Sequence, residues 1–190
     1  MKKNTFSFYL LSFGLISILA ATQSCNKGTT DQTEKKENLV HGNMSFDIPM
    51  QSITGDNDSI VSFYYKMNMD SFVKSYGSQY DTSSIRNAKL SSCVLSITGS
   101  DTNNNFRNFH TTNIGITSGT NKYIYRIAAF TDIVDTNAYS INIPRSYDPN
   151  LASYFKSDSV RYRLYGNMRR PTSADIKCTA HLNFELVLVK

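Results

Sequence analysis

A two-residue alternation runs through residues 175–189, with every second residue apolar and the residues between them polar as far as Glu185, and it constrains the fold more than any other feature of the sequence. Successive side chains of a β-strand point to opposite faces of its sheet, so this run predicts a strand with one buried and one solvent-facing side. Strands usually contain about 3 to 10 residues, so we expect a bulge or bend within the run. Its apolar positions are Ile176, Cys178, Ala180, Leu182, Phe184, Leu186 and Leu188.

Seven earlier segments also have strand character, and the sequence is rich in Ser, Thr and Asn, which favour turns and solvent-facing strand positions over helix interiors. The chain of 190 residues is long enough for one domain with its own core. We therefore predict an all-β fold, an antiparallel two-sheet β-sandwich, immunoglobulin-like or related, formed by residues 40–190 as a single domain. The seven segments are residues 45–50, 60–69, 85–98, 111–118, 122–130, 139–143 and 159–169.

Turn chemistry and helix caps suggest how these strands are connected. Residues 170–173 (Arg-Pro-Thr-Ser) predict a turn that joins the last two strands as a terminal hairpin. A short helix is predicted over residues 71–76, capped by Asp70 and ended by Gly77. A second helical turn is predicted to start at Asp148 and Pro149 and to reach Phe155.

The first 24 residues have the layout of a secretory signal peptide. Lys2 and Lys3 precede a largely apolar run over residues 6–21, followed by a short polar stretch. A transmembrane helix is the alternative, but polar residues interrupt the run and it is shorter than the roughly 20 apolar residues that a span needs. Removal of residues 1–24 is the favoured interpretation.

Cys25 directly follows this segment, and residues 1–25 resemble the signal of the bacterial lipoprotein class. The class usually has Leu three residues before its cysteine and a small residue two before it, where this chain has Thr22 and Gln23. The resemblance implies that Cys25 is lipidated and anchors the protein to the bacterial envelope, at the outer membrane on its periplasmic or cell-surface face. Cleavage near Ala21, leaving Cys25 as a free thiol, is the alternative.

Residues 25–39 are expected to form the lipidated cysteine and a flexible tether, because residues 26–38 contain no apolar side chain. Removal of the signal segment takes away two lysines and no acidic residue, which lowers the formal net charge of +5 by two. With so modest a basic excess and no basic cluster, nucleic-acid binding is not expected.

No motif in the sequence predicts catalysis. Nucleophile-elbow, zinc-protease and phosphate-loop patterns are absent from it, so we expect a non-enzymatic protein without cofactor or metal. A hydrolase is the least favoured alternative, and it requires His110 or His181 to lie beside a serine and a carboxylate. Asp101, Asn103 and Asn105 could bind calcium, as could residues 56–58, but these residue types are more typical of turns.

Cys93 and Cys178 share the apolar parity of their strands and are expected to point into the core. Two buried free thiols are favoured, because facing sheets lie about 10 Å apart and a disulfide needs Cα atoms within roughly 7 Å. Whether the two cysteines form a disulfide stays open at this point.

The solvent-facing parity of residues 159–169 carries the predicted ligand-binding residues. They are Arg161, Arg163, Tyr165 and Arg169, with Asn167 between the last two. Their planar donors would stand in a row and suit carboxylate, sulfate or phosphate groups, and Tyr123 and Tyr125 could extend the surface for a glycan. Alternatively, solvent-facing arginines discourage aggregation.

These features predict an exported, lipid-anchored binding or accessory module for a glycan or protein partner, with no nucleic-acid ligand. A structural subunit of a surface assembly is the alternative. That alternative needs an exchangeable edge strand, for which residues 45–50 and the last run are the candidates.

Overall fold

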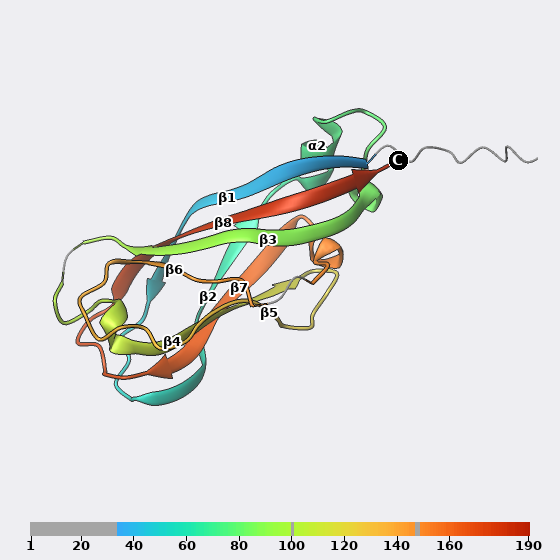
Figure 1. Cartoon of the computed structure of the whole chain (residues 1–190). Coiled ribbons are helices and arrows are strands. Elements are labelled where there is room, and N and C mark those ends of the chain that lie inside the picture. Colours follow the sequence, from blue (N-terminus) through green and yellow to red (C-terminus); the bar gives the residue numbers. More distant parts are fainter. Residues whose placement is uncertain (1–33, 100, 147–148) are drawn as a thin grey trace, which may run out of the picture. The chain divides into compact units, whose positions relative to one another are not determined.

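The computed structural model describes residues 34–99, 101–146 and 149–190, and these form two antiparallel four-stranded sheets (Figure 1). The first sheet has the order β1-β8-β3-β6 and the second β2-β7-β4-β5. The predicted all-β sandwich is therefore confirmed. The strands are β1 (Glu34–Ile48), β2 (Gly55–Lys66), β3 (Ile85–Ile97), β4 (Phe109–Ser118), β5 (Tyr125–Phe130), β6 (Ser140–Asn142), β7 (Ser159–Met168) and β8 (Ile176–Val189).

The strands pair in a nested order that defines a jelly roll. The first strand pairs with the last, β2 with β7, β3 with β6 and β4 with β5, all antiparallel. Two further ladders, β3 with β8 and β4 with β7, complete the two sheets. An immunoglobulin-type sandwich distributes its strands differently between the sheets, so within the predicted class the fold is a jelly roll.

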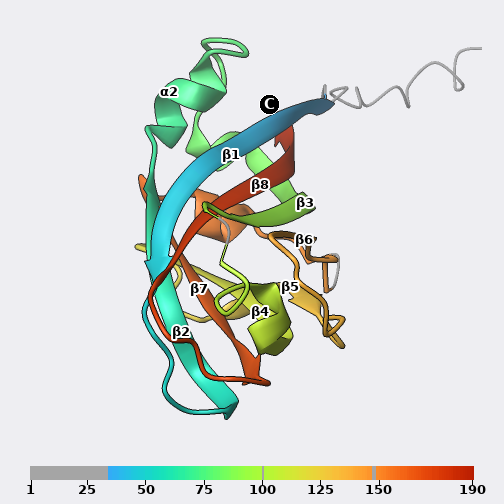
Figure 2. The same cartoon turned by 90° about the vertical axis from the view of Figure 1, so that its left-hand side faces the viewer.

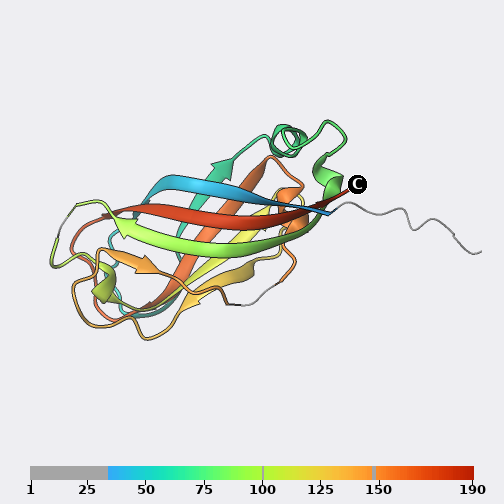
Figure 3. The ribbon, with the colours of Figure 1, turned by 45° about the horizontal axis from the view of Figure 1, so that its top comes forward.

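β8 forms the centre of the first sheet, with β1 on one side and β3 on the other (Figure 3). Buried residues alternate without interruption with exposed or partly exposed ones from Ile176 to Val189. The expected bulge is not in this strand, because the register shifts are taken up by one extra residue in β1 and two in β3. A regular central strand is thus matched to irregular neighbours.

The predicted terminal hairpin is wrong, since β7 and β8 belong to different sheets. The segment between them crosses from one sheet to the other and is held by distant partners. Thr172 N–H donates to the Gln51 carbonyl at 2.9 Å, and Gln51 N–H donates to Thr172 Oγ1 at 2.8 Å. Turn residues predict a change of chain direction, but they do not decide in which sheet the next strand lies.

Residues 34–39 belong to strand β1, so the predicted tether is corrected for these residues and the predicted domain boundary at residue 40 lies inside a strand. Glu34 pairs with Val189 and the ladder continues through Leu39. Main-chain pairing needs no apolar side chain, and Lys35 Nζ lies 4.9 Å from the ring centre of Tyr76 and donates to its carbonyl at 3.2 Å. Residues 1–33, including Cys25 and the signal segment, lie outside the described residues.

The short helix predicted near residue 71 exists as α2 (Met69–Lys74), at the end of the molecule where β8 ends (Figure 2). Its cap is Asn68 rather than Asp70: the Asn68 side chain accepts from Ser71 N–H at 2.8 Å. Asp70 lies in the first turn and pairs with Lys74 at 2.6 Å. The second predicted turn is the 3₁₀ helix η3 (Ala152–Phe155), while Asp148 lies outside the described residues.

Aromatic rings join the two sheets in the core. Phe46 of β1 stacks on Phe63 of β2 at 4.2 Å between ring centres, and Phe63 meets the fully buried Tyr162 of β7 at 5.5 Å. Phe155 of η3 packs edge-on against Phe184 of β8 at 4.9 Å. In the described part of the chain no helix is long and apolar enough to cross a membrane.

Cys93 and Cys178 are buried free thiols, as favoured from the sequence. They lie on β3 and β8 of the same sheet, not on facing sheets: Cys93 pairs with Leu182 and Cys178 with Ile97. The four-residue offset along the ladder corresponds to about 13 Å, too far for a disulfide. Burial raises the pKa of each thiol to about 12.

Candidate functional site

The outer face of the sheet β2-β7-β4-β5 carries the predicted arginines. Along β7, Val160, Tyr162 and Leu164 are buried between the sheets, whereas Arg161 and Arg163 are partly exposed. The predicted orientation of the arginines is therefore confirmed. Both stand on an interior strand of the sheet, with β2 on one side and β4 on the other.

A hollow of about 280 Å³ lies on this face, which we call the cationic groove. Three of its residues are positively charged and none is acidic. In the part of the chain that the structure describes, none of these three cations forms an ion pair. The groove thus offers unneutralised positive charge. It is lined by Tyr64, Thr117, Ser118, Gly119, Lys122, Ile124, Ser159, Arg161 and Arg163.

Arg161 is held on the floor of the groove by its neighbours on both sides. It pairs in register with Tyr64 of β2 and Thr117 of β4, and its guanidinium carbon lies 5.3 Å from the Tyr64 ring centre. This cation–π contact fixes the direction of the side chain. Arg161 Nε is buried and has no hydrogen-bond partner among the described residues, so no hydrogen bond at Nε helps to orient the side chain.

Gly115 lies between two arginines of the sheet, where neighbouring side chains leave no room for a Cβ atom. It pairs with Arg163 of β7 on one side and with Arg126 of β5 on the other. A Cβ atom at Gly115 would lie 2.8 Å from Ile124 Cγ2 and 3.4 Å from Tyr165 Cε1, so a side chain there would meet the wall of the groove. The glycine therefore lets Ile124 and Tyr165 approach the sheet between the cations.

Tyr165 lies beside the groove, not in its lining. Burial raises the pKa of its phenol, and the nearby positive charges of Arg126 and Arg163 act in the opposite direction. Tyr165 therefore stays neutral at physiological pH. We expect it to pack beside the groove and not to contact a ligand directly.

A loop anchored on η3 supplies Lys122 and the neighbouring Tyr123. Thr120 Oγ1 donates to the Ser153 carbonyl at 3.0 Å, and Asn121 Nδ2 donates to Ser153 Oγ at 3.1 Å. The Tyr154 hydroxyl donates to the Tyr123 carbonyl at 3.1 Å. With its backbone held in this way, the loop presents the Tyr123 side chain 73% exposed.

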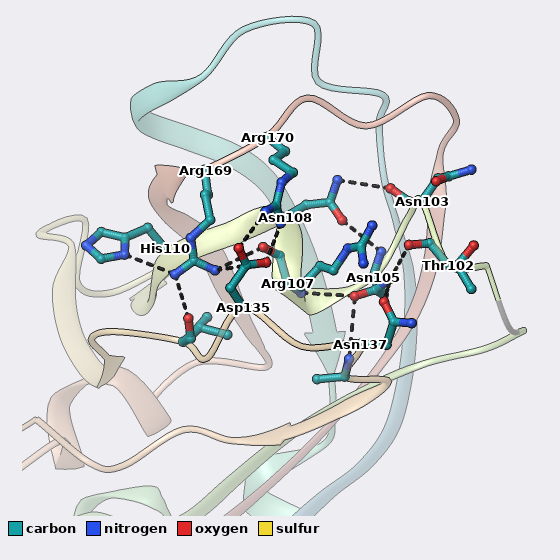
Figure 4. A network of polar contacts seen from close by, with 12 residues as sticks. Thr102, Asn103, Asn105, Arg107, Asn108, His110, Asp135, Asn137, Arg169 and Arg170 are labelled. Atoms are coloured by element: carbon teal, nitrogen blue, oxygen red, sulfur yellow. Dashed lines mark hydrogen bonds and ion pairs between the residues drawn. The ribbon is translucent and has the colours of Figure 1, made fainter.

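Arg169 does not belong to the groove, which corrects the predicted row of four residues. It lies just past the end of β7, roughly 25 Å along the chain direction from Arg161. Its guanidinium donates to the carbonyls of Arg107 at 3.2 Å and Ile133 at 2.7 Å, which ties loops together at the far end of the sheet (Figure 4). Alternation correctly gave Arg169 a partly exposed position, but it could not show that loop carbonyls bind its guanidinium.

The Asn-rich loop at that far end has a structural role. Asp101 accepts from the Asn103 amide at 2.7 Å and from the Asn104 side chain. Asn105 and Asn108 form a reciprocal cap around the 3₁₀ helix η2 (Phe106–Asn108). These contacts support the turn interpretation over calcium binding. Asp56 likewise accepts from Asn167 Nδ2 at 2.9 Å.

The contacts of His110 differ from those of a catalytic triad. Its Nδ1 lies 3.3 Å from Arg169 Nη2, and its Nε2 lies 3.4 Å from Asp132 Oδ1. His181 stands on the partly exposed face of β8, opposite Val94. The described contacts of His110 include a carboxylate but no serine hydroxyl.

Sequence reasoning missed Tyr64, Lys122 and Arg126. Residues 122–130 are apolar on both parities, so the pattern did not show which side chains face solvent. The register brings Arg126 opposite Gly115 and Tyr64 opposite Arg161, and these are pairings between distant segments. Tyr123 was recognised as a candidate and is exposed, whereas Tyr125 packs partly against the core.

Comparison with known proteins adds no family. No family model matches the chain, and no curated protein matches it. Among solved structures, it is similar to the structure of the infectious bursal disease virus Gx strain, with 10% identity, 82% of this chain and 32% of that chain covered, and a TM-score of 0.39. The VP2 subviral particle of the same virus gives 8% identity, the same coverage and the same TM-score.

A third similar structure, of Desmodium yellow mottle tymovirus, has 12% identity and a TM-score of 0.23, with 82% of this chain and 84% of that chain covered. The chain spans about a third of the length of the bursal disease virus chains that it matches. At these TM-scores the likeness does not bear on function.

Proposed function

We propose that this protein is an exported, lipid-anchored binding module of the bacterial envelope, outer-membrane bound on the periplasmic or cell-surface face, whose cationic groove takes an anionic glycan or protein partner. The observation that carries the proposal is the lining of the groove, where Arg161, Arg163 and Lys122 stand together without a carboxylate. Planar guanidinium groups bind carboxylate, sulfate and phosphate in paired hydrogen bonds.

The charge distribution of the two sheets supports a specific role for this face. On the first sheet, lysines stand beside glutamates: Lys35 pairs with Glu37 at 3.1 Å and Lys36 lies 4.0 Å from Glu185. Arginines that protect a sheet against aggregation are expected at its edges, but Arg161 and Arg163 lie on an interior strand. Protection of an edge therefore does not explain them.

Charge reversal at the groove tests binding. Arg161→Glu together with Arg163→Glu is expected to remove binding to the ligands that the wild type retains on arrayed glycans and envelope proteins, while the melting temperature changes little. Arg86→Glu with Lys190→Glu changes the net charge equally at exposed positions elsewhere and should keep binding. A wild-type protein that retains no ligand on either screen would refute the proposal.

Replacement of the predicted lipid-bearing residue, Cys25, tests whether the protein is anchored to a membrane. Cys25→Ser is expected to abolish incorporation of labelled fatty acid and to release the protein from the membrane fraction, whereas Cys93→Ala should leave both unchanged. Normal labelling and membrane retention of Cys25→Ser would contradict the anchoring.

A further inference from the structure

We infer that the ligand of the cationic groove is an acidic glycan, a polysaccharide bearing sulfate or carboxylate groups, rather than an acidic peptide. This inference rests on the proposed function and deepens it. Arg161, Arg163 and Lys122 pair with the anionic groups, and the exposed rings of Tyr64 and Tyr123 contact the sugar faces.

The two tyrosines are the first argument for a sugar. Tyr64 is 62% and Tyr123 is 73% exposed, although large apolar side chains are mostly buried in this domain. Tyr64 lines the groove, and Tyr123 lies in the chain between its lining residues Lys122 and Ile124. An aromatic face gains contact energy by packing against the C–H groups of a sugar ring, while the hydroxyl edge stays solvated.

The main-chain groups of the sheet beneath the groove are already hydrogen-bonded, which argues against a bound peptide strand. Extended peptides commonly bind by adding a strand to a free sheet edge, where main-chain groups give most of the affinity. The groove lies over β7 and the end of β4; there β7 is paired on both sides, with β2 and β4, and Thr117 and Ser118 of β4 are paired with β7. Apart from Gly119, the lining offers a ligand side chains, which suits a polymer recognised through its charged groups, hydroxyls and ring faces.

The spacing of the donors is the third argument. Arg161 and Arg163 are two residues apart on one strand, so their Cα atoms are separated by about 7 Å. The hydroxyl groups of Thr117 and Ser159 also line the groove. A volume of about 280 Å³ is at the lower limit of small-molecule sites, so the groove holds one short stretch of a longer chain.

The test uses the purified full-length chain and four immobilised polymers: dextran sulfate, polygalacturonate, neutral dextran and poly-L-glutamate. Binding is measured by biolayer interferometry at low and moderate salt. We expect binding to one or both acidic polysaccharides, none to neutral dextran, and at least about tenfold weaker binding to poly-L-glutamate. Affinity should fall with salt.

Tyr123→Ala separates the two ligand classes, because Tyr123 contributes a ring to the site and no charge. It is expected to weaken polysaccharide binding about tenfold and to leave any binding of poly-L-glutamate unchanged. Val134→Ala, which trims another exposed apolar side chain, serves as the control.

The outcomes distinguish this inference from the proposed function. Equal binding of poly-L-glutamate and polysaccharides, with no effect of Tyr123→Ala, would overturn the inference of a glycan ligand. The groove would then be a site that binds anionic groups of a protein partner, as the proposed function also allows. Absence of binding to all three acidic polymers, or unchanged binding by the Arg161→Glu, Arg163→Glu variant, would overturn the proposal that the cationic groove is the binding site.

Discussion

At the scale of single residues, the two core cysteines give a direct measure of how closed the sandwich is. In a Cys25→Ser chain only Cys93 and Cys178 remain, and burial raises the pKa of both to about 12. Since the thiolate is the reactive form, we predict no alkylation by iodoacetamide at pH 8 in the native protein and alkylation of both residues in guanidinium. Mass spectrometry reads the result.

Rapid labelling of either thiol without denaturant would contradict that closed core.

The arginines of β7 show what the alternation of apolar and polar residues can and cannot predict. It correctly placed Arg161 and Arg163 on the outer face, because their neighbours Val160, Tyr162 and Leu164 are apolar. At Arg169, one residue past the strand, it predicted the partial exposure but not the side-chain direction, which contacts with loop carbonyls decide.

At the scale of elements, Asn108 joins η2 to the segment that crosses between the sheets. Its Nδ2 donates to the carbonyls of Asn103 at 3.0 Å and Pro171 at 2.9 Å, and its Oδ1 accepts from Asn105 N–H at 3.2 Å. Asn108→Ala leaves buried main-chain groups unpaired. We predict a loss of about 2 kcal/mol in the free energy of unfolding, measured by urea denaturation.

The matched control for that change is Asn103→Ala. Asn103 is exposed and takes part in the loop through its main chain, so this variant should lie within about 0.5 kcal/mol of the wild type. Equal stabilities of the two variants would show that the side chain of Asn108 does not hold the crossing segment.

The first residues of β1 contribute to the stability of the first sheet. Residues 34–38 pair with residues 185–189, so a chain that begins at Leu39 loses the first part of this ladder. We predict that it unfolds at a lower urea concentration than a chain that begins at Glu34, with at least about 1 kcal/mol less stability. If residues 34–38 were only a tether, the two chains would be equally stable.

Edge positions also bear on the alternative of a surface-assembly subunit. β1, which contains residues 45–48 of the predicted exchangeable segment, is an edge strand. The last run is not, because β8 lies between β1 and β3.

The eight strands could be predicted from local sequence patterns, but their order in the sheets could not. The nested pairing joins segments as distant as residues 34 and 189, and local patterns carry no information on such pairs.

At the scale of the whole molecule, the acidic side chains set the response to low pH. Hydrogen bonds hold the pKa values of three aspartates below the usual range of an aspartate: a Ser83 hydroxyl at Asp81, the Asn104 side-chain amide at Asp101 and the Arg170 guanidinium at Asp135. Since a lowered pKa means that the folded state favours the carboxylate, these groups stabilise the fold at neutral pH.

Their contribution is lost as the pH falls through the lowered pKa values. We predict that the melting temperature changes little between about pH 7 and pH 5 and declines below about pH 4. Replacing all three aspartates with asparagine should make that acid decline shallower in differential scanning calorimetry. An unchanged decline would show that other groups control acid unfolding.

The central place of β8 has a consequence for when this chain can fold. β8 follows both of its partners, β1 and β3, in the chain, so neither of these can form its ladder with β8 until residues 176–189 are present. In a growing chain this sheet therefore stays incomplete until residues 176–189 have been made. For a protein that crosses a membrane before folding, as we propose for this one, the late arrival of β8 helps to keep the first sheet unfolded during transport, and the sheet forms when β8 inserts between β1 and β3.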